Sequence, residues 1–217
     1  MKKNYENLNI EVVIWDLDGT LYPWDEVFWR EDFKAVAKSI EDLGVLTFEE
    51  AYNEAKGSFD IYNLTFEVFI EKYGIPFNDL ELRHIVNFDA SKLTKLPELY
   101  EFFKKSDSKH HYIVSDAPKK WVFKILSTLG YNNFFTTSHV LSKENLRYKK
   151  RVSIEWIEKI INCKKYTPAQ ILIVDNTLDN LLPLKEAGYK TYFIDDKNYR
   201  KSIEKLLKML TNLTNSN

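Results

Sequence analysis

From about residue 97 onward, short apolar runs alternate with amphipathic helical segments, and this alternation constrains the fold more than any other feature of the chain. Strands are expected at residues 111–114, 134–135, 171–174 and 191–194, and an earlier run at residues 10–15 has the same character. Helical periodicity is found at residues 97–105, 119–129, 153–162, 178–187 and 200–210. Strands that alternate with helices form a parallel sheet covered on both faces, so the pattern predicts an α/β fold.

Between residues 25 and 88 the pattern is helical only. Apolar residues recur at steps of three and four from Val27 to Ile40, and Gly44 interrupts the segment. The sequence Thr47-Phe48-Glu49-Glu50 predicts the capped start of a second helix, and two more helices fit residues 64–73 and 79–87. We therefore predict a core of residues 8–22 and 92–210, a helical insert of residues 23–91 and a disordered tail of residues 211–217.

Charge and composition exclude several classes of partner. The 31 Lys and Arg residues nearly balance the 32 Asp and Glu residues, so no overall basic field favours nucleic acid or an anionic membrane. No apolar stretch has the length of a signal peptide or a membrane span, so we expect a cytoplasmic protein. The single cysteine, Cys163, is expected to be a buried structural thiol. The sequence leaves the oligomeric state open.

Polar residues gather where the predicted strands end, which is where parallel α/β sheets bind ligands. The first run ends in Asp16-Leu17-Asp18-Gly19-Thr20. Alternate residues of an extended chain face the same side, so Asp16 and Asp18 would project together. Two adjacent carboxylates repel each other unless a cation lies between them or one gains a proton, and oxygen ligands of this kind suit Mg²⁺.

Three further polar features follow in order. Ser115 comes directly after residues 111–114, the run Lys149-Lys150-Arg151 precedes a predicted helix, and Asp175 and Asp179 follow residues 171–174. A serine hydroxyl and a lysine can both bind an anionic oxygen. Taken singly, these features are ordinary turn residues, a solvated charged face and a helix entrance. Their joint order at strand ends favours a functional site.

The same residues resemble the four motifs of the haloacid dehalogenase (HAD) superfamily. The first is Asp16-Leu17-Asp18-Gly19-Thr20-Leu21-Tyr22, the second and third are Ser115 and a lysine before a helix, and the fourth is Val174-Asp175-Asn176-Thr177-Leu178-Asp179. The resemblance spans about residues 10–194. It implies a Rossmann-like core whose helical insert is a cap. The continuation Thr20-Leu21-Tyr22-Pro23 is most similar to that of the pyrimidine-nucleotidase-like phosphatases.

The resemblance implies catalytic roles for the first motif. Asp16 would be the nucleophile that forms an aspartyl-phosphate, and Asp18 would be the general acid and base. Thr20 would orient Asp18 through its hydroxyl. Superfamily members that remove halides normally lack the second acid of this motif, so the presence of Asp18 favours phosphate chemistry.

The resemblance also implies which residues bind the substrate and the metal. Ser115 and Lys150 would bind the phosphoryl oxygens. Lys150 stands the usual distance before an aromatic helix residue, and Lys149 is the alternative. Asp16, Asp175 and Asp179 would hold Mg²⁺ together with the backbone carbonyl of Asp18.

The resulting hypothesis is a Mg²⁺-dependent phosphatase for a small soluble ester, such as a nucleotide or a sugar phosphate. A phosphomutase and a non-catalytic module that binds phosphometabolites are the alternatives. Trp24, Phe28 and Trp29 are expected to pack the insert, or to form an aromatic shelf for a base or sugar.

Overall fold

The computed structural model describes residues 9–62, 64–106, 110–146, 150, 155–157 and 165–214. The chain divides into two compact units. The first, which we call the sheet unit, is formed by residues within Met1–Pro23 and Lys95–Asn217. The second, Trp24–Thr94, is the helical unit.

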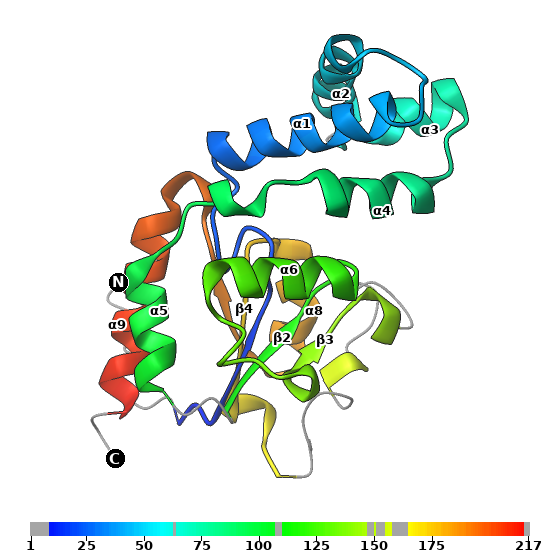
Figure 1. Cartoon of the computed structure of the whole chain (residues 1–217). Helices are drawn as coiled ribbons and strands as arrows, with labels where there is room; N and C mark the ends of the chain where they lie inside the picture. The colour runs from blue at the N-terminus through cyan, green and yellow to red at the C-terminus, as the bar shows by residue number, and fades with distance from the viewer. Residues whose placement is uncertain are drawn as a thin grey trace. The chain divides into compact units, whose positions relative to one another are not determined.

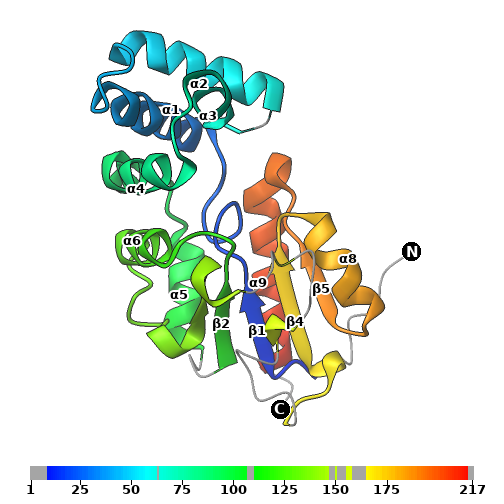
Figure 2. The same cartoon turned by 90° about the vertical axis from the view of Figure 1, so that its right-hand side faces the viewer.

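A parallel sheet forms the centre of the sheet unit, with its strands in the order β3-β2-β1-β4-β5 (Figures 1 and 2). The strands are β1 (Val12–Trp15), β2 (His111–Val114), β3 (Val140–Leu141), β4 (Ile171–Asp175) and β5 (Lys190–Phe193). In the register of the ladder, Trp15 at the end of β1 lies beside Ile113 of β2 and Val174 of β4. The polar residues that follow these three adjacent strands are therefore neighbours.

Helices cover both faces of this sheet (Figures 1 and 2). They are α5 (Pro97–Lys105), α6 (Lys119–Leu129), α8 (Leu178–Glu186) and α9 (Tyr199–Thr214). One face packs Val12 and Ile14 against Leu181 and Leu184 of α8. On the other face the ring of Trp15 contacts α5, where α9 lies alongside. The predicted α/β fold with a Rossmann-like parallel sheet is confirmed.

The strand predicted at residues 134–135 is wrong. The backbone N–H groups of Phe134 and Phe135 both donate to the carbonyl of Tyr131, at 2.9 and 3.3 Å, so this segment is a turn. The Phe135 side chain is buried, with its ring 5.1 Å from that of Phe103. These residues are apolar because the turn is anchored in the core. The edge strand next to β2 is β3, not the predicted strand at residues 134–135.

The C-terminal helix is longer than predicted. α9 continues to Thr214, so the first four residues of the predicted disordered tail are helical. Leu206 and Leu210 are buried, and this packing extends the helix beyond its predicted end. Most of the helix predicted at residues 153–162 lies outside the described residues, as do Cys163 and Lys149. Trp156 and Ile157, which the structure does describe, are helical and buried.

The helical unit has a hydrophobic core of its own. Its helices are α1 (Glu26–Glu41), α2 (Phe48–Tyr62), α3 (Glu67–Tyr73) and α4 (Phe77–Asn87), which confirms the predicted all-helical insert. The core contains Val36, Ala37, Ile40, Ala51, Ala55, Phe69, Ile75 and Leu80. The predicted cap at Thr47 is present, because Thr47 and Glu50 exchange backbone-to-side-chain hydrogen bonds.

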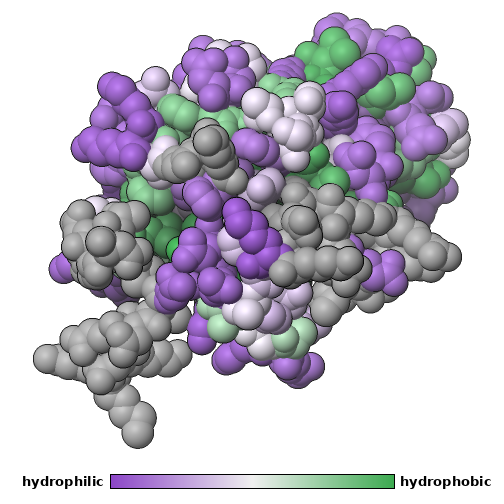
Figure 3. All heavy atoms as spheres, turned by 90° about the horizontal axis from the view of Figure 1, so that it is seen from below, coloured by the Kyte–Doolittle hydropathy of each residue, from purple (hydrophilic) through white to green (hydrophobic). Residues whose placement is uncertain are grey.

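One face of the molecule is rich in polar side chains (Figure 3). Figure 3 shows one face of the molecule on which hydrophilic residues predominate and apolar residues occur in separate places. None of the helices in the described ranges combines the length and the apolar character that a crossing of a bilayer requires.

The turn after α6 leads to a prediction about stability. Phe135→Ala removes a buried ring from the aromatic core, so we expect it to lower the free energy of unfolding by about 3–5 kcal/mol in urea denaturation. Phe134→Ala is the matched control, because its ring is only half-buried and should cost less. An equal or larger loss for Phe134→Ala would contradict the assignment of this segment as a turn anchored by Phe135.

Candidate active site

The segment after β1 forms a tight turn that places Asp16 and Asp18 at the end of the central strand. The Asp16 backbone N–H donates to the Val174 carbonyl at 2.8 Å, which ties this residue to β4. The backbone N–H of Leu21 then donates to the Leu17 carbonyl at 2.9 Å. Gly19 has a φ of 77°, a left-handed conformation that glycine adopts without steric cost. The sequence Asp-Leu-Asp-Gly-Thr therefore has a glycine at the position where the turn needs one.

Asp16 is almost completely buried and is held through both of its carboxylate oxygens. Thr20 Oγ1 donates to Asp16 Oδ2 at 3.0 Å, and Lys150 Nζ donates to Asp16 Oδ1 at 2.5 Å. The prediction that Thr20 orients Asp18 is thus wrong, because the turn directs its hydroxyl to Asp16. Burial raises the pKa of Asp16 to about 7, although the nearby ammonium group of Lys150 opposes this shift.

Lys150 links the first strand end to the fourth motif. Its Nζ also donates to Asp175 Oδ2 at 2.9 Å, and both side chains are buried. Burial alone would lower the pKa of Lys150, but the charges of Asp16 and Asp175 outweigh it and raise the pKa above its usual value. The Lys150 backbone N–H donates to Asp116 Oδ1 at 3.1 Å, which fixes the lysine beside the loop after β2.

Asp175 is oriented by the start of α8. The Thr177 backbone N–H donates to Asp175 Oδ1 at 2.8 Å, and Asn180 Nδ2 lies 3.2 and 3.0 Å from the two carboxylate oxygens. Sequence reasoning missed Asn180, although its place on the first helical turn after Asp175 was a usable signal. Asp179 is exposed, and the structure does not bring it together with Asp16 and Asp175. Its predicted role as a metal ligand stays a prediction, and the adjacent Asn180 is the residue directed at Asp175.

The strongest contacts of Asp18 come from Tyr22 and Trp121, to which the sequence assigned no role. Tyr22 Oη and Trp121 Nε1 both donate to Asp18 Oδ1, the latter at 2.7 Å. Ser115 Oγ lies 3.4 Å from Asp18 Oδ2, so the predicted phosphate-binding serine is beside the predicted acid. Burial raises the pKa of Asp18, and the hydrogen bonds from Tyr22 and Trp121 limit this rise. Tyr22 lies within the first motif, whereas Trp121 comes from α6 and no local pattern marks it.

The carboxylates fit a hard divalent cation. Asp16 Oδ1 and Asp175 Oδ2 converge on a single cationic atom, Lys150 Nζ. Mg²⁺ is commonly bound by one or two carboxylates, with water and substrate phosphate oxygens as its other ligands. Within the described ranges no three Asp, Glu, His or Cys side chains form a metal-binding group, so a bound ion would need such additional ligands. The cavity at this point is narrow, and Ile14, Ile173 and Leu184 contribute apolar walls to it.

The aromatic residues of the helical unit pack mainly against one another. Phe28 is buried, and its ring lies 5.0 Å from that of Trp29. The Trp29 ring lies 4.3 Å from that of Phe59. Trp24 stacks on Phe28 but keeps 37% of its surface exposed. The expected packing role is therefore observed for Phe28 and Trp29, and the aromatic shelf stays a prediction.

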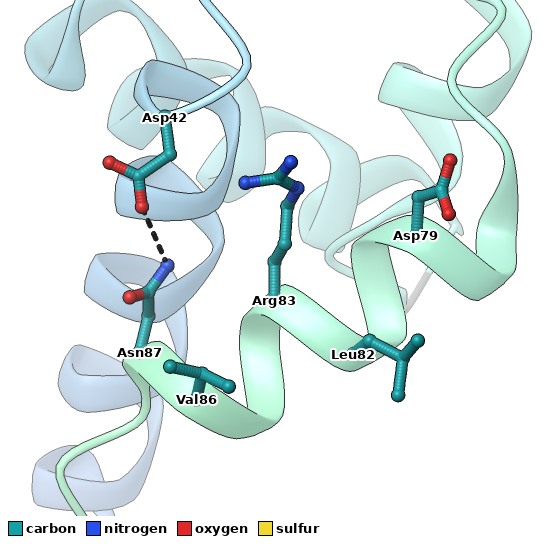
Figure 4. Close-up of a pocket in the computed structure, with 6 residues that line it drawn as sticks. All are labelled: Asp42, Asp79, Leu82, Arg83, Val86 and Asn87. Atoms are coloured by element: carbon teal, nitrogen blue, oxygen red, sulfur yellow. Dashed lines mark hydrogen bonds between the residues drawn. The ribbon is translucent and has the colours of Figure 1, made fainter.

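A second hollow, of about 450 Å³, lies in the helical unit. It is lined by Asp42, Asp79, Leu82, Arg83, Val86 and Asn87. Figure 4 shows the Arg83 guanidinium group between the two aspartates and the hydrogen bond from Asn87 to Asp42. Because Asp79 is exposed and Asp42 pairs with the exposed Lys38, these acids lack the buried, convergent arrangement found in the sheet unit.

Comparison of the structure with solved structures identifies its fold. No protein-family model and no curated protein matches the sequence. A HAD phosphatase from Thermococcus onnurineus superposes with a TM-score of 0.55 at 16% identity, over 86% of both chains. YfnB of Bacillus subtilis, described as a HAD-hydrolase and crystallised bound to magnesium, gives 0.58 at 16% identity, over 86% of this chain and 87% of its own. A Thermotoga maritima protein described as a β-phosphoglucomutase gives 0.58 at 17% identity, over 85% of both chains.

These likenesses show the class of fold. The chain has the fold of HAD-superfamily hydrolases, and the predicted resemblance to that superfamily is confirmed at this level. The finer resemblance to pyrimidine-nucleotidase-like phosphatases stays a prediction.

The Lys150 ion pairs lead to a second prediction. Lys150→Met leaves Asp16 and Asp175 buried without their cation, so we expect the free energy of unfolding to fall by about 3–5 kcal/mol when a chelator is present. Chemical denaturation measures this loss. Lys38→Met is the matched control, because Lys38 also contacts two carboxylates but is exposed, and its removal should have a much smaller effect. Equal effects of the two substitutions would show that the buried pairs do not stabilise the sheet unit.

Proposed function

We propose that this protein is a Mg²⁺-dependent phosphomonoesterase that transfers a phosphoryl group first to Asp16 and then to water. The observation that carries the proposal is the convergence of the buried Asp16 and Asp175 on one cationic atom, with the separately held Asp18 two residues after Asp16. The HAD fold supports the same reaction class, because several structural neighbours are named phosphatases or hydrolases.

Asp16 is the proposed nucleophile. An oxygen of its carboxylate would attack phosphorus, forming an Asp16–phosphate bond as the bond to the leaving oxygen breaks. Attack requires the ionised carboxylate; burial raises the pKa of Asp16 and disfavours that form, whereas Lys150 favours it. Thr20 supports the nucleophile by holding its Oδ2.

Asp18 is the proposed general acid and base. It would give its proton to the leaving oxygen as the ester bond breaks, so the alcohol departs neutral. In the second step it would take a proton from the attacking water, which releases inorganic phosphate and restores the protonated acid and the free Asp16. Burial favours the protonated starting form, because it raises the pKa of Asp18.

Charge neutralisation completes the proposal. When bound, Mg²⁺ would supply electrostatic stabilisation of the phosphoryl oxygens and of the carboxylate that attacks phosphorus. Asp16 and Asp175 are the side chains that would hold it, together with the backbone carbonyl of Asp18. Ser115 and Lys150 are the proposed partners of the phosphoryl oxygens, since both lie within hydrogen-bond range of the acids that surround the reacting group.

The proposed substrate is a small phosphate ester, such as a nucleotide or a sugar phosphate, and the helical unit is proposed to select it as a cap. A phosphomutase is the second candidate, because a structural neighbour is described as a β-phosphoglucomutase. Product analysis separates the two: a phosphatase releases inorganic phosphate, whereas a mutase returns the phosphoryl group to a second position of the substrate. A non-catalytic module would bind the ester without turnover, which the presence of both acids of the first motif argues against.

The third prediction tests the two acids. Asp16→Asn should abolish phosphate release from a panel of phosphorylated metabolites, because an amide is not a nucleophile for phosphorus. Asp18→Asn should lower turnover of alkyl esters by about 10²- to 10⁴-fold, since the leaving oxygen loses its proton donor. Removal of Mg²⁺ with a chelator should stop the wild-type reaction.

Asp60→Asn is the control for these substitutions, because Asp60 is an exposed residue of the helical unit. Its activity should equal that of the wild type. Full activity of Asp16→Asn would show that Asp16 is not the nucleophile.

A further inference from the structure

The two carboxylate oxygens of Asp18 have different surroundings. Oδ1 accepts hydrogen bonds from Tyr22 Oη and from Trp121 Nε1, which is 2.7 Å away. Among the residues that the structure describes, Oδ2 has only a long contact of 3.4 Å with Ser115 Oγ. That hydroxyl also accepts a hydrogen bond from the Ala117 backbone N–H at 3.1 Å. The strong contacts of Asp18 thus all fall on one oxygen.

The chemistry of the donors to Oδ1 bears on which oxygen of Asp18 carries a proton. The N–H of tryptophan donates and has no lone pair in the ring plane that could accept. A proton on Asp18 Oδ1 would displace one of its two donors: toward Trp121 it would meet another proton, and toward Tyr22 it would require the hydroxyl to turn and accept. A proton on Oδ2 leaves both hydrogen bonds to Oδ1 in place, so Oδ2 is the oxygen favoured to carry it.

The contacts also fix the orientation of the side chain. Tyr22 comes from the turn after β1, where residues 18 and 22 form an isolated bridge, and Trp121 comes from the first turn of α6. Both rings are buried. Two rigid donors from separate elements restrict the carboxyl group of Asp18 more tightly than a single donor would.

We propose that Trp121 and Tyr22 are positioning residues that fix Asp18 so that its Oδ2 gives the proton to the leaving oxygen and takes it from water. This inference rests on the proposed role of Asp18 as general acid. Nothing in the first motif assigns a role to either ring, and Trp121 lies more than a hundred residues away in the sequence.

Esters with different leaving groups test the proposal. An alkyl phosphate needs a proton on its departing oxygen, whereas a nitrophenyl phosphate releases a stable phenolate without one. Leaving-group release is followed by rapid mixing in Mg²⁺, so that only transfer to the enzyme is measured. Trp121→Phe keeps the ring but removes the N–H, and we expect it to slow transfer from the alkyl ester by at least about tenfold, a part of the usual contribution of a general acid. Transfer from the nitrophenyl ester should change by less than about threefold.

Tyr22→Phe provides a second, smaller change, because it removes only a hydroxyl group from the same oxygen. It should show the same preference for slowing the alkyl ester, and it keeps the test valid if Trp121→Phe does not fold. Trp15→Phe is the matched control, since its buried indole N–H donates to His111 Nδ1 at 3.1 Å instead of to Asp18. Tyr131→Phe is the corresponding control for a buried tyrosine. Neither control should change the ratio of the two rates.

Equal slowing of both esters by Trp121→Phe and Tyr22→Phe would overturn the inference, because a purely structural role does not depend on the leaving group. Wild-type protein that transfers phosphate from neither ester would instead overturn the proposed function, and the inference with it.

Discussion

The placement of two negative charges on adjacent buried strands is the constraint on which the rest of the sheet unit depends. The parallel register sets Trp15 of β1 beside Val174 of β4, so the next residues, Asp16 and Asp175, are neighbours at the same edge. Burial of one ionised carboxylate is costly, and burial of two together is more so. Lys150 Nζ lies within hydrogen-bond distance of both. Each of the three charges is tolerated there because the other two are present.

This arrangement connects loops that are distant in the sequence. Lys150 is held through its backbone by Asp116, the residue after Ser115. Asp175 is held by Thr177 and Asn180 at the start of α8. The loops after β2 and β4 thus meet the turn after β1 through short polar contacts. A parallel sheet makes such a meeting possible, because the carboxyl ends of its strands lie along one edge.

Much of this edge could be predicted from the sequence. Apolar strand runs and the polar residues that end them are local signals, and they located Asp16, Asp18, Ser115 and Asp175. The partners of those residues could not be predicted, because they depend on the path of the turn and on contacts between elements. Thr20 bonds to Asp16 instead of Asp18 for the first reason, and Trp121 reaches Asp18 from α6 for the second. The choice between Asp179 and Asn180 depends on which side of a helical turn faces the sheet.

A short apolar run has the same sequence pattern in a buried strand and in a buried turn. For this reason a strand was wrongly predicted at residues 134–135. In the helical unit the longer periodic segments were predicted correctly, since helices of this length show several repeats of their pattern. The proposed role of that unit as a cap would depend on side chains that contact the substrate, and the sequence pattern does not reveal which these are.

The most direct test of the chemistry is the identification of the residue that accepts the phosphoryl group. Asp18→Asn protein can be mixed with a nitrophenyl phosphate and Mg²⁺, because this leaving group needs no proton and the loss of the base slows hydrolysis of the intermediate. Acid quenching and peptide mass spectrometry should then find a phosphoryl group on Asp16, removable by hydroxylamine as an acyl phosphate is. Phosphate on another residue, or none at all while the wild-type enzyme turns the ester over, would contradict phosphoryl transfer through Asp16.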